Sequence, residues 1–257
     1  MIWQLQTFVD NHYLSSKHLT FLMDELPGYI SLVFLATTLA TLGFVFYAIR
    51  EVKSANSKSL SVIVLLGLLT WLALTGYLAY AGFYREFEAM PPRLLFAIGP
   101  ANLLIIVLLA VKKSRDYLMK VPISILTYLH IIRIPIEMVL WWLALSGAVP
   151  MMLTFEGVNY DILSGVTAPF VAIFFVSEKR NNRIAAILWN LITLGLLINI
   201  VGHALLSAPT PFQRFNFDNP VMAPFYLPYI WLPAFIVPAV FFSHLVSLVQ
   251  LFSKKEF

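Results

Sequence analysis

The amino-acid sequence predicts an all-α, polytopic membrane protein. We expect a bundle of seven transmembrane helices, with the N-terminus outside and the C-terminus in the cytoplasm. Three observations lead to this fold class: the composition, the lengths of the apolar segments, and the distribution of Lys and Arg between the two sides. Apolar residues make up 60% of the 257 residues and charged residues only 12%, about half the charged fraction of a soluble domain.

Seven apolar runs are separated by charged or Pro-rich breaks. Most of them reach the roughly 20 residues that an α-helix needs to cross the hydrocarbon core of a bilayer. The runs are continuously apolar rather than alternating, which favours helices over the strands of a barrel. The fifth is short, so we expect it to begin in the interface. In chain order the predicted spans are Tyr29–Ile49, Leu60–Phe83, Leu94–Val111, Val121–Leu145, Asp161–Val176, Ile184–Leu206 and Leu227–Phe252.

The basic residues are unequally divided between the two sides. The loops after spans one, three and five, together with the C-terminal tail, hold 12 of the 17 Lys and Arg residues, and the opposite side holds 4. The remaining one is Arg133, inside span four. Basic residues concentrate on the cytoplasmic side of membrane proteins. The split therefore predicts the orientation stated above, and an odd number of spans agrees with it.

Two regions follow from this arrangement. Residues 1–28 mix polar side chains with Leu5, Phe8 and Val9 at helical spacing, which predicts an extracytoplasmic segment lying in the outer interface. Residues 29–257 form the single seven-helix transmembrane domain. The amino terminus has no basic region followed by an early apolar run, so no cleaved signal peptide is expected. The outer loop at 207–228, rich in Pro and aromatic residues, would either cap the bundle or anchor at the headgroups.

Composition also excludes several classes of function. The chain has no cysteine, which excludes disulfides, thiolate catalysis and Cys-ligated iron–sulfur clusters. Its net charge of +4 reflects the cytoplasmic loops, so the expected partner is the lipid bilayer and not nucleic acid. Span seven contains no lysine for a retinal Schiff base. No cofactor is indicated, and partner proteins are not identified.

Span four carries polar residues that a bilayer disfavours. His130, Arg133 and Glu137 lie at positions i, i+3 and i+7, along one stripe of the predicted helix. A charge at the centre of the bilayer costs about 2.5–3.5 kcal/mol on insertion scales, so partners or water must offset it. Arg133 and Glu137 are spaced to pair with each other. Pro135 removes a backbone hydrogen bond and frees the carbonyl of Ile131, which predicts a kink.

Depth along the spans predicts a polar site in the outer half of the bundle. At about 1.5 Å per residue, Arg133 lies near mid-depth and Glu137 above it. The segment FEGVNYDILSG precedes span five, and span six brings two more polar residues to the outer half. Intramembrane ionisable residues are functional candidates by default. The predicted ligand-binding residues are Arg133, Glu137, Asn159, Asp161, Asn199 and His203.

Structural roles for the same residues remain open. Asp161 directly precedes span five and suits an N-cap, and Asn159 could serve only the turn before it. Asn199 and His203 could form an ordinary interhelical hydrogen-bonded pair, and Glu156 could be solvated in the loop. His244, near the inner end of span seven, is interpreted as a packing residue.

Three classes of function are compatible with this site. The preferred one is the binding or transport of a small ligand or ion, with Arg133 neutralising an anion or Glu137 carrying a proton. An alternative is a membrane-embedded, metal-dependent hydrolase with His203, Glu156 and Asp161 as metal ligands, although no compact ligand motif is present. A third is a structural or assembly factor without a small ligand. Whether the protein is an enzyme is left open.

Three stretches carry a resemblance to a known family. The segments FEGVNYDILSGVTAP, HIIRIPIE and APTPFQRF resemble an uncharacterised family of bacterial seven-helix integral membrane proteins. The resemblance covers most of the chain from about span two onward. It implies a bacterial inner-membrane setting and brings no activity, cofactor or catalytic residue with it.

Overall fold

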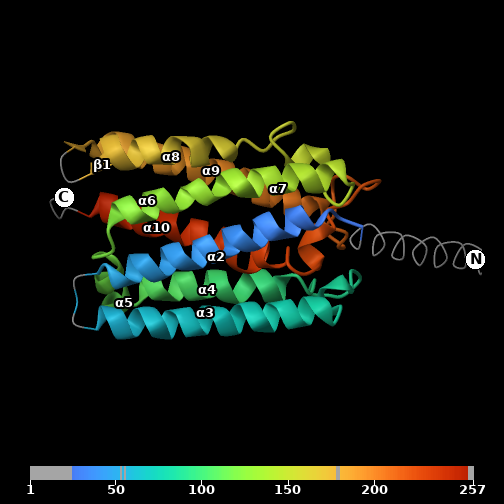
Figure 1. The fold of residues 1–257 in the computed structure, drawn as a ribbon, viewed down its shortest axis with the longest axis horizontal. Coiled ribbons are helices and arrows are strands. Elements are labelled where there is room, and N and C mark those ends of the chain that lie inside the picture. Colours follow the sequence, from blue (N-terminus) through green and yellow to red (C-terminus); the bar gives the residue numbers. More distant parts are fainter. Residues whose placement is uncertain (1–24, 53, 55, 178–179, 254–257) are drawn as a thin grey trace, which may run out of the picture.

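The computed structural model describes residues 25–52, 54, 56–177 and 180–253 (Figure 1). The predicted interfacial segment, residues 1–28, falls almost entirely outside the described residues. Figure 1 shows the helices side by side along the long axis of the bundle, which confirms the all-α prediction. In chain order they are α2 (Gly28–Arg50), α3 (Ser57–Tyr80), α4 (Leu95–Ala110), α5 (Lys112–Leu118), α6 (Ile123–Leu129), α7 (Arg133–Leu145), α8 (Ile162–Phe174), α9 (Arg183–Ser207) and α10 (Val237–Phe252). Two short strands, β1 (Val176–Ser177) and β2 (Arg180–Asn181), form a hairpin between α8 and α9.

Helices form at all seven predicted positions, but only some are long enough to cross a membrane. Five segments are sufficiently long and apolar, namely α2, α3, α9 and the continuous helical segments Ile123–Leu145 and Leu232–Phe252. The third predicted span, α4, has 16 residues and bends by 93° into α5. The fifth, α8, has 13 residues, or about 20 Å of helix against a hydrocarbon core of about 30 Å. The structure therefore supports a membrane protein, with five helices among the described residues that are long and apolar enough to span a bilayer, or six if α4 and α5 form one broken span.

The predicted irregularity in span four is present. A 3-10 turn at His130–Ile132 separates α6 from α7, and Pro135 lies in the first turn of α7. Because proline has no N–H to donate, the carbonyls of the preceding turn lose an α-helical partner. The tightened turn lies immediately before Arg133, so it sets the direction in which the guanidinium leaves the helix.

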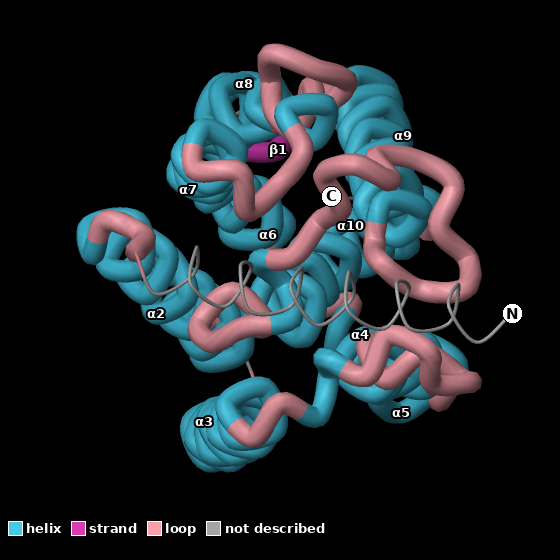
Figure 2. The backbone as a smooth tube through the Cα atoms, turned by 90° about the vertical axis from the view of Figure 1, so that its right-hand side faces the viewer, coloured by secondary structure: helices cyan, strands magenta, loops and turns pink. Residues whose placement is uncertain are grey.

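α10 occupies the middle of the bundle. In the end-on view of Figure 2 it is surrounded by α9, α6, α2 and α4, and its segment is the most buried of the five that could span a membrane. The outer helices instead expose large apolar side chains, such as Leu66 on α3, Phe170 on α8 and Ile192 on α9. A soluble protein would not leave such large apolar surfaces uncovered, whereas a lipid environment covers them.

Part of the chain before α8 is buried in the bundle. Figure 1 shows that α8 ends well short of the end that α7 reaches, and the preceding segment continues along α7. Thr154 and Asn159 in that segment are fully buried. α8 approaches the 3-10 turn closely at Gly165, where an added Cβ would lie 2.8 Å from Cγ1 of Ile134 and 3.1 Å from its backbone nitrogen. Only glycine permits this contact, which brings the start of α8 beside Arg133.

The loop at 207–228, predicted to lie outside, covers one end of the bundle in part and remains partly exposed. The backbone N–H groups of Met222 and Ala223 each donate to the carbonyl of Ala148 at 3.1 Å. Phe225 is buried and packs edge-to-face on Phe87. Phe217, in the first half of the loop, is exposed. Of the two predicted roles, capping the bundle and anchoring at the headgroups, the second half of the loop has the first.

Candidate functional site

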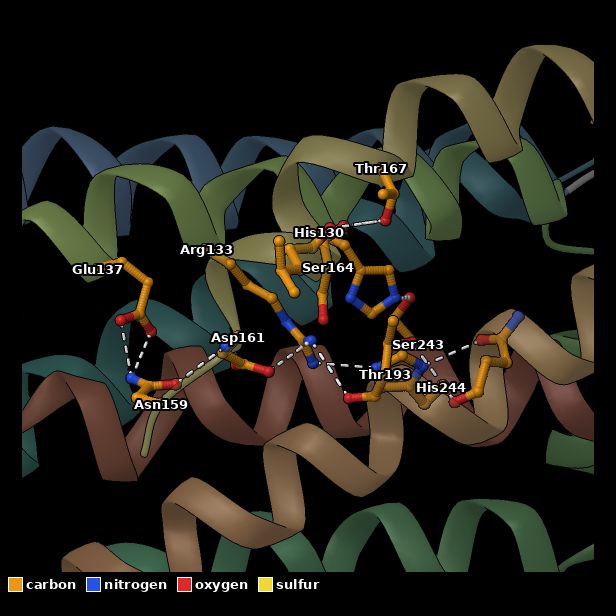
Figure 3. Close-up of polar contacts among 12 residues, drawn as sticks. His130, Arg133, Glu137, Asn159, Asp161, Ser164, Thr167, Thr193, Ser243 and His244 are labelled. Atoms are coloured by element: carbon orange, nitrogen blue, oxygen red, sulfur yellow. Dashed lines mark hydrogen bonds and ion pairs between the residues drawn. The ribbon is translucent and has the colours of Figure 1, made fainter. Parts of the chain in front are cut away.

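A buried polar network lies where α7, α8, α9 and α10 meet (Figure 3). Its centre is Arg133, the first residue of α7, which is 3% exposed. Nη1 of Arg133 donates to Oδ1 of Asp161 at 2.9 Å and to the carbonyl of Thr193 at 3.3 Å. Nη2 lies 3.0 Å from Nε2 of His244. One guanidinium therefore connects the start of α8 with α9 and α10.

The ion pair differs from the one that the spacing in span four suggests. Arg133 pairs with Asp161 and not with Glu137, its neighbour at i+4. Asp161 stands directly before α8, as an N-cap would, but its side chain makes no capping hydrogen bond. Its carboxylate is turned toward Arg133 instead, and a buried ion pair of this kind is stabilised by the low local dielectric once both charges are desolvated.

Glu137 is held by an amide rather than by a cation. Nδ2 of Asn159 lies 2.7 Å from both carboxyl oxygens of Glu137 and 3.1 Å from the carbonyl of Leu153. Since an amide nitrogen has two hydrogens, one bonds Leu153 and the other is shared between the two carboxyl oxygens. Oδ1 of Asn159 accepts the backbone N–H of Asp161 at 3.1 Å, so a single amide connects the carboxyl group of Glu137 to the backbone of Asp161.

His244 extends the network across α10. A guanidinium has only donors, so Nε2 of His244 must accept the Arg133 hydrogen bond. Nδ1 then carries the proton and donates to Oδ1 of Asn190 at 3.0 Å, while Nδ2 of Asn190 donates to the carbonyl of Ala186. These bonds are mutually consistent only with a neutral imidazole at His244.

A second buried histidine lies beside the first. The rings of His130 and His244 are 4.1 Å apart between centroids and inclined by 31°. Ser243 donates to the carbonyl of Leu126 at 2.6 Å, so its oxygen accepts from Nε2 of His130 at 3.2 Å. Among the described residues, Nδ1 of His130, Nε of Arg133 and Oγ of Ser164 have no hydrogen-bond partner, although buried polar atoms are normally satisfied.

A small cavity adjoins the two carboxyl groups. Its volume is about 30 Å³, and Arg133, Glu137 and Asp161 supply its polar lining. The remaining lining is aliphatic and comes from Ile132 in the 3-10 turn, α7, α9 and the segment 232–240. A cavity must offer about 10–15 Å³ on this scale to hold one water. The space therefore accommodates a water molecule or two, or a monatomic ion, and excludes sugars, amino acids and nucleotides.

The structure brings together four of the six residues predicted to bind a ligand. Arg133, Glu137, Asn159 and Asp161 form the network described above. Asn199 lies apart from it and donates to the carbonyl of Val158 at 3.0 Å, so it supports the backbone of the segment that carries Asn159. The predicted pair of Asn199 with His203 exists only through the backbone carbonyl of Asn199, which lies 2.8 Å from Nδ1 of His203.

The three predicted metal ligands are not brought together. His203 stacks on Phe215 near the C-terminal end of α9, Glu156 is exposed, and Asp161 is paired with Arg133. In the described part of the chain, no group of three His, Cys, Asp or Glu residues is arranged to hold a metal ion. The geometry thus gives no support to a metal site at His203, Glu156 and Asp161, because these side chains face separate surroundings.

Sequence reasoning missed the inner half of the network. His244 was interpreted as a packing residue, yet it is fully buried and bonds directly to Arg133. Its position in the predicted seventh span would have identified it, because His244 lies eight residues before the end of α10, about 12 Å along the helix axis. Asn190 lies at a comparable depth on α9. An ionisable residue at that depth is a functional candidate by default.

We expect His244→Ala and His203→Ala to differ sharply in stability. The first leaves Nη2 of Arg133 and Oδ1 of Asn190 buried without partners, at about 1–3 kcal/mol each. The second removes a half-buried ring that bonds its own helix, which costs less than about 1 kcal/mol. Thermal unfolding in detergent should lower the Tm of the first variant by roughly 5–15 °C and leave the second near the parent. Equal losses would contradict the hydrogen bonds assigned to His244.

The comparisons with known proteins identify one family. A family model described as a domain of unknown function, DUF8737, matches residues 91–252. No curated protein and no solved structure matches the chain. The matched residues run from the start of the third apolar segment to the end of α10 and contain every member of the polar network. Since the match covers more than half of the sequence, the chain belongs to the DUF8737 family, which is consistent with its resemblance to an uncharacterised family.

Proposed function

We propose that this protein is a seven-span, single-domain protein of a bacterial inner membrane that binds a proton or a small cation at Glu137 and carries it across the bilayer. The bacterial setting follows from the family resemblance of the sequence. The ligand class follows from the charges and the cavity of the buried network. The sequence alone favoured binding or transport of a small ligand or ion, and the network restricts that ligand to a proton or a small cation.

The seven-span topology is supported by the chain on either side of α4 and α8, the two helices that are too short to span a bilayer alone. α8 begins beside Arg133, near mid-depth, and protein covers part of the non-helical chain before it, since Thr154 and Asn159 are fully buried. Irregular backbone is tolerated at membrane depth only where protein or a water-filled cavity covers it. α8 and this segment together form the fifth span. The third span is α4, whose bend directs α5 away from the helix axis, along the membrane surface.

The orientation is supported by the charges at the two ends of the bundle. The loops after α2 and α4, the hairpin after α8 and the end of α10 gather at one end (Figure 1). Among the residues with described side chains, that end carries seven basic residues and the other carries three. The first set is Arg50, Lys58, Lys112, Lys113, Arg115, Lys120 and Arg183, and the second is Arg85, Arg93 and Arg214. The richer end is cytoplasmic by the positive-inside rule.

The observation that carries the function is an imbalance of buried charge. The network holds two carboxyl groups, Glu137 and Asp161, but a single guanidinium, and the hydrogen bonds of His244 require a neutral ring. Only Asp161 is paired with Arg133, while Glu137 is 2% exposed and bonded to a neutral amide. An uncompensated buried carboxylate is too costly to persist. Glu137 therefore takes up a proton, or a cation enters the cavity beside it.

Proton flux into liposomes tests this function. Purified protein is reconstituted with a pH-sensitive dye inside, and a potassium diffusion potential drives proton entry. We expect acidification faster than in empty liposomes for the parent and for Glu156→Gln, a control on an exposed carboxylate of the same outer segment. Glu137→Gln should acidify no faster than empty liposomes, although its amide oxygen can still accept the Asn159 hydrogen bond and preserve the fold.

The ion is distinguished in the same assay. The assay is run with choline as the external cation and repeated with Na⁺ in its place. Na⁺ leaves the proton flux unchanged if the site carries only protons, and it suppresses the flux if Na⁺ competes for the site. Flux at the parent rate in Glu137→Gln would contradict the proposal. Acidification by the parent protein at the rate of empty liposomes would also contradict it. The network would then have a structural role, joining α7 to α10.

A further inference from the structure

A second and much larger hollow lies on the other side of the bundle, between α3 and α4. Its volume is about 870 Å³, near the upper end of the range for small-molecule sites. α3 and α4 supply its walls, and the segment 234–242 of the last span supplies its floor. The floor includes Ala234 and Ala239, whose small side chains leave the space open. This groove is independent of the network around Arg133.

The groove is about as long as one leaflet is thick. On α3 its lining extends from Ser59 to Trp71, twelve residues or about 18 Å of helix. Trp71 closes the deep end, since its indole N–H donates to the carbonyl of Ala234 at 3.0 Å. Half of a hydrocarbon core is about 15 Å. An acyl chain that enters from the end near Ser59 would therefore reach Trp71 at the middle of the bilayer.

The open end of the groove is polar and positively charged. Lys113, Ser114, Tyr117 and Lys120 line it together with Asp116, and both lysines are exposed. α5 carries Lys113, and Lys120 follows two residues after its end; α5 is bent by 93° from α4 and so crosses the end of the groove. Residues 112–120 hold four basic residues against Asp116 alone. Basic residues at a membrane surface attract anionic lipid headgroups.

We propose that this groove binds one anionic phospholipid from the leaflet on the side of α5. The phosphate lies between Lys113 and Lys120, and an acyl chain lies between α3 and α4 above the aromatic floor of Phe235 and Phe242. The length of the groove selects a molecule of a single leaflet, and the charge at its mouth selects an anionic headgroup. The inference uses the embedding of the bundle in a membrane and is independent of Glu137.

Native mass spectrometry of the detergent-solubilised protein tests the proposal. Phosphatidylglycerol is added as the probe, with phosphatidylcholine of the same acyl chains as the neutral reference. We expect phosphatidylglycerol to bind more tightly than phosphatidylcholine. The double variant Lys113→Gln with Lys120→Gln should weaken the binding of phosphatidylglycerol by about fivefold for each lysine removed. The matched control, Lys112→Gln with Arg115→Gln, removes the same charge from α5 outside the groove and should keep the preference.

A groove-filling variant tests the apolar part separately. Ala101→Phe on α4 projects a ring into the groove and should weaken the binding of both lipids. A parent-like elution profile in size-exclusion chromatography verifies that this variant is folded. Equal binding of the two lipids by the parent would overturn the proposal, as would equal losses in the two charge variants. A dimer of the parent that disappears in Ala101→Phe would also overturn it, because a second copy would then occupy the groove.

Discussion

Replacing Arg133 by Met should destabilise the protein by about 3–5 kcal/mol, the usual cost of removing one partner of a buried ion pair. The change leaves the Asp161 carboxylate buried without its cation. It also removes the donor to Nε2 of His244 and to the carbonyl of Thr193. Arg214→Met is the matched control, because Arg214 is exposed and its loss should change stability by less than about 0.5 kcal/mol.

A double-mutant cycle separates the ion pair from the other bonds of Arg133. Asp161→Asn alone leaves a buried guanidinium without its counterion and should also be strongly destabilising. Removing both charges eliminates the mismatch, so Arg133→Met with Asp161→Asn should lose less stability than the two single variants summed, by about 0.5–3 kcal/mol. Thermal or chemical unfolding in detergent measures all three. Strict additivity would show that the two side chains do not interact as the structure has them.

Gly157→Ala should be the most damaging glycine substitution in the outer segment. An added Cβ would overlap the carbonyl oxygen of Met152 and would lie 2.6 Å from its Cα. These are backbone atoms, so no side-chain rotation relieves the overlap. The same carbonyl accepts the N–H of Val158 at 2.9 Å, and that bond would open. The displaced segment carries Asn159, the donor to Glu137.

The expected cost of Gly157→Ala is about 3 kcal/mol or more, at or above the upper end of ordinary overpacking. Gly195→Ala is the control: nothing lies within 4 Å of an added Cβ at this position of α9. Because alanine favours helix over glycine, this variant should be neutral or slightly more stable. Unfolding temperatures of the two variants measure the contrast. A parent-like Gly157→Ala protein would mean that the turn at 152–158 is more open than described.

The apolar runs predicted where the helices lie, because a bilayer demands long uninterrupted apolar segments. α2 and α9 begin and end within one residue of their expected limits. The shortness of α8 was foreseen, but the burial of the chain before it was not. Hydropathy measures composition along the chain, whereas the burial of Thr154 and Asn159 depends on the close contact at Gly165.

The polar site was predicted in part for a similar physical reason. Depth along a helix follows from residue number, and it grouped Arg133 with Glu137, Asn159 and Asp161, which lie together, but also with Asn199 and His203, which lie apart. That these residues bind a ligand stays a prediction. The direction in which each side chain points depends on helix rotation, which a single sequence does not contain. That is why the spacing suggested a pair of Arg133 with Glu137, while the structure pairs Arg133 with Asp161. The hydrogen bond between Arg133 and His244 could not be predicted for the same reason, because it also depends on helix rotation.

The central claim is that Glu137, when no metal cation occupies the cavity beside it, is protonated inside the bundle while Asp161 remains ionised beside Arg133. Infrared difference spectroscopy of the protein in lipid nanodiscs, recorded as the pH is stepped, tests it most directly. A protonated carboxyl group has a carbonyl stretch that is distinct from the bands of carboxylates. The account predicts such a band in the parent and in Glu156→Gln, its loss at high pH, and its absence in Glu137→Gln. A spectrum without a protonated carboxyl, or one that persists in Glu137→Gln, would contradict it.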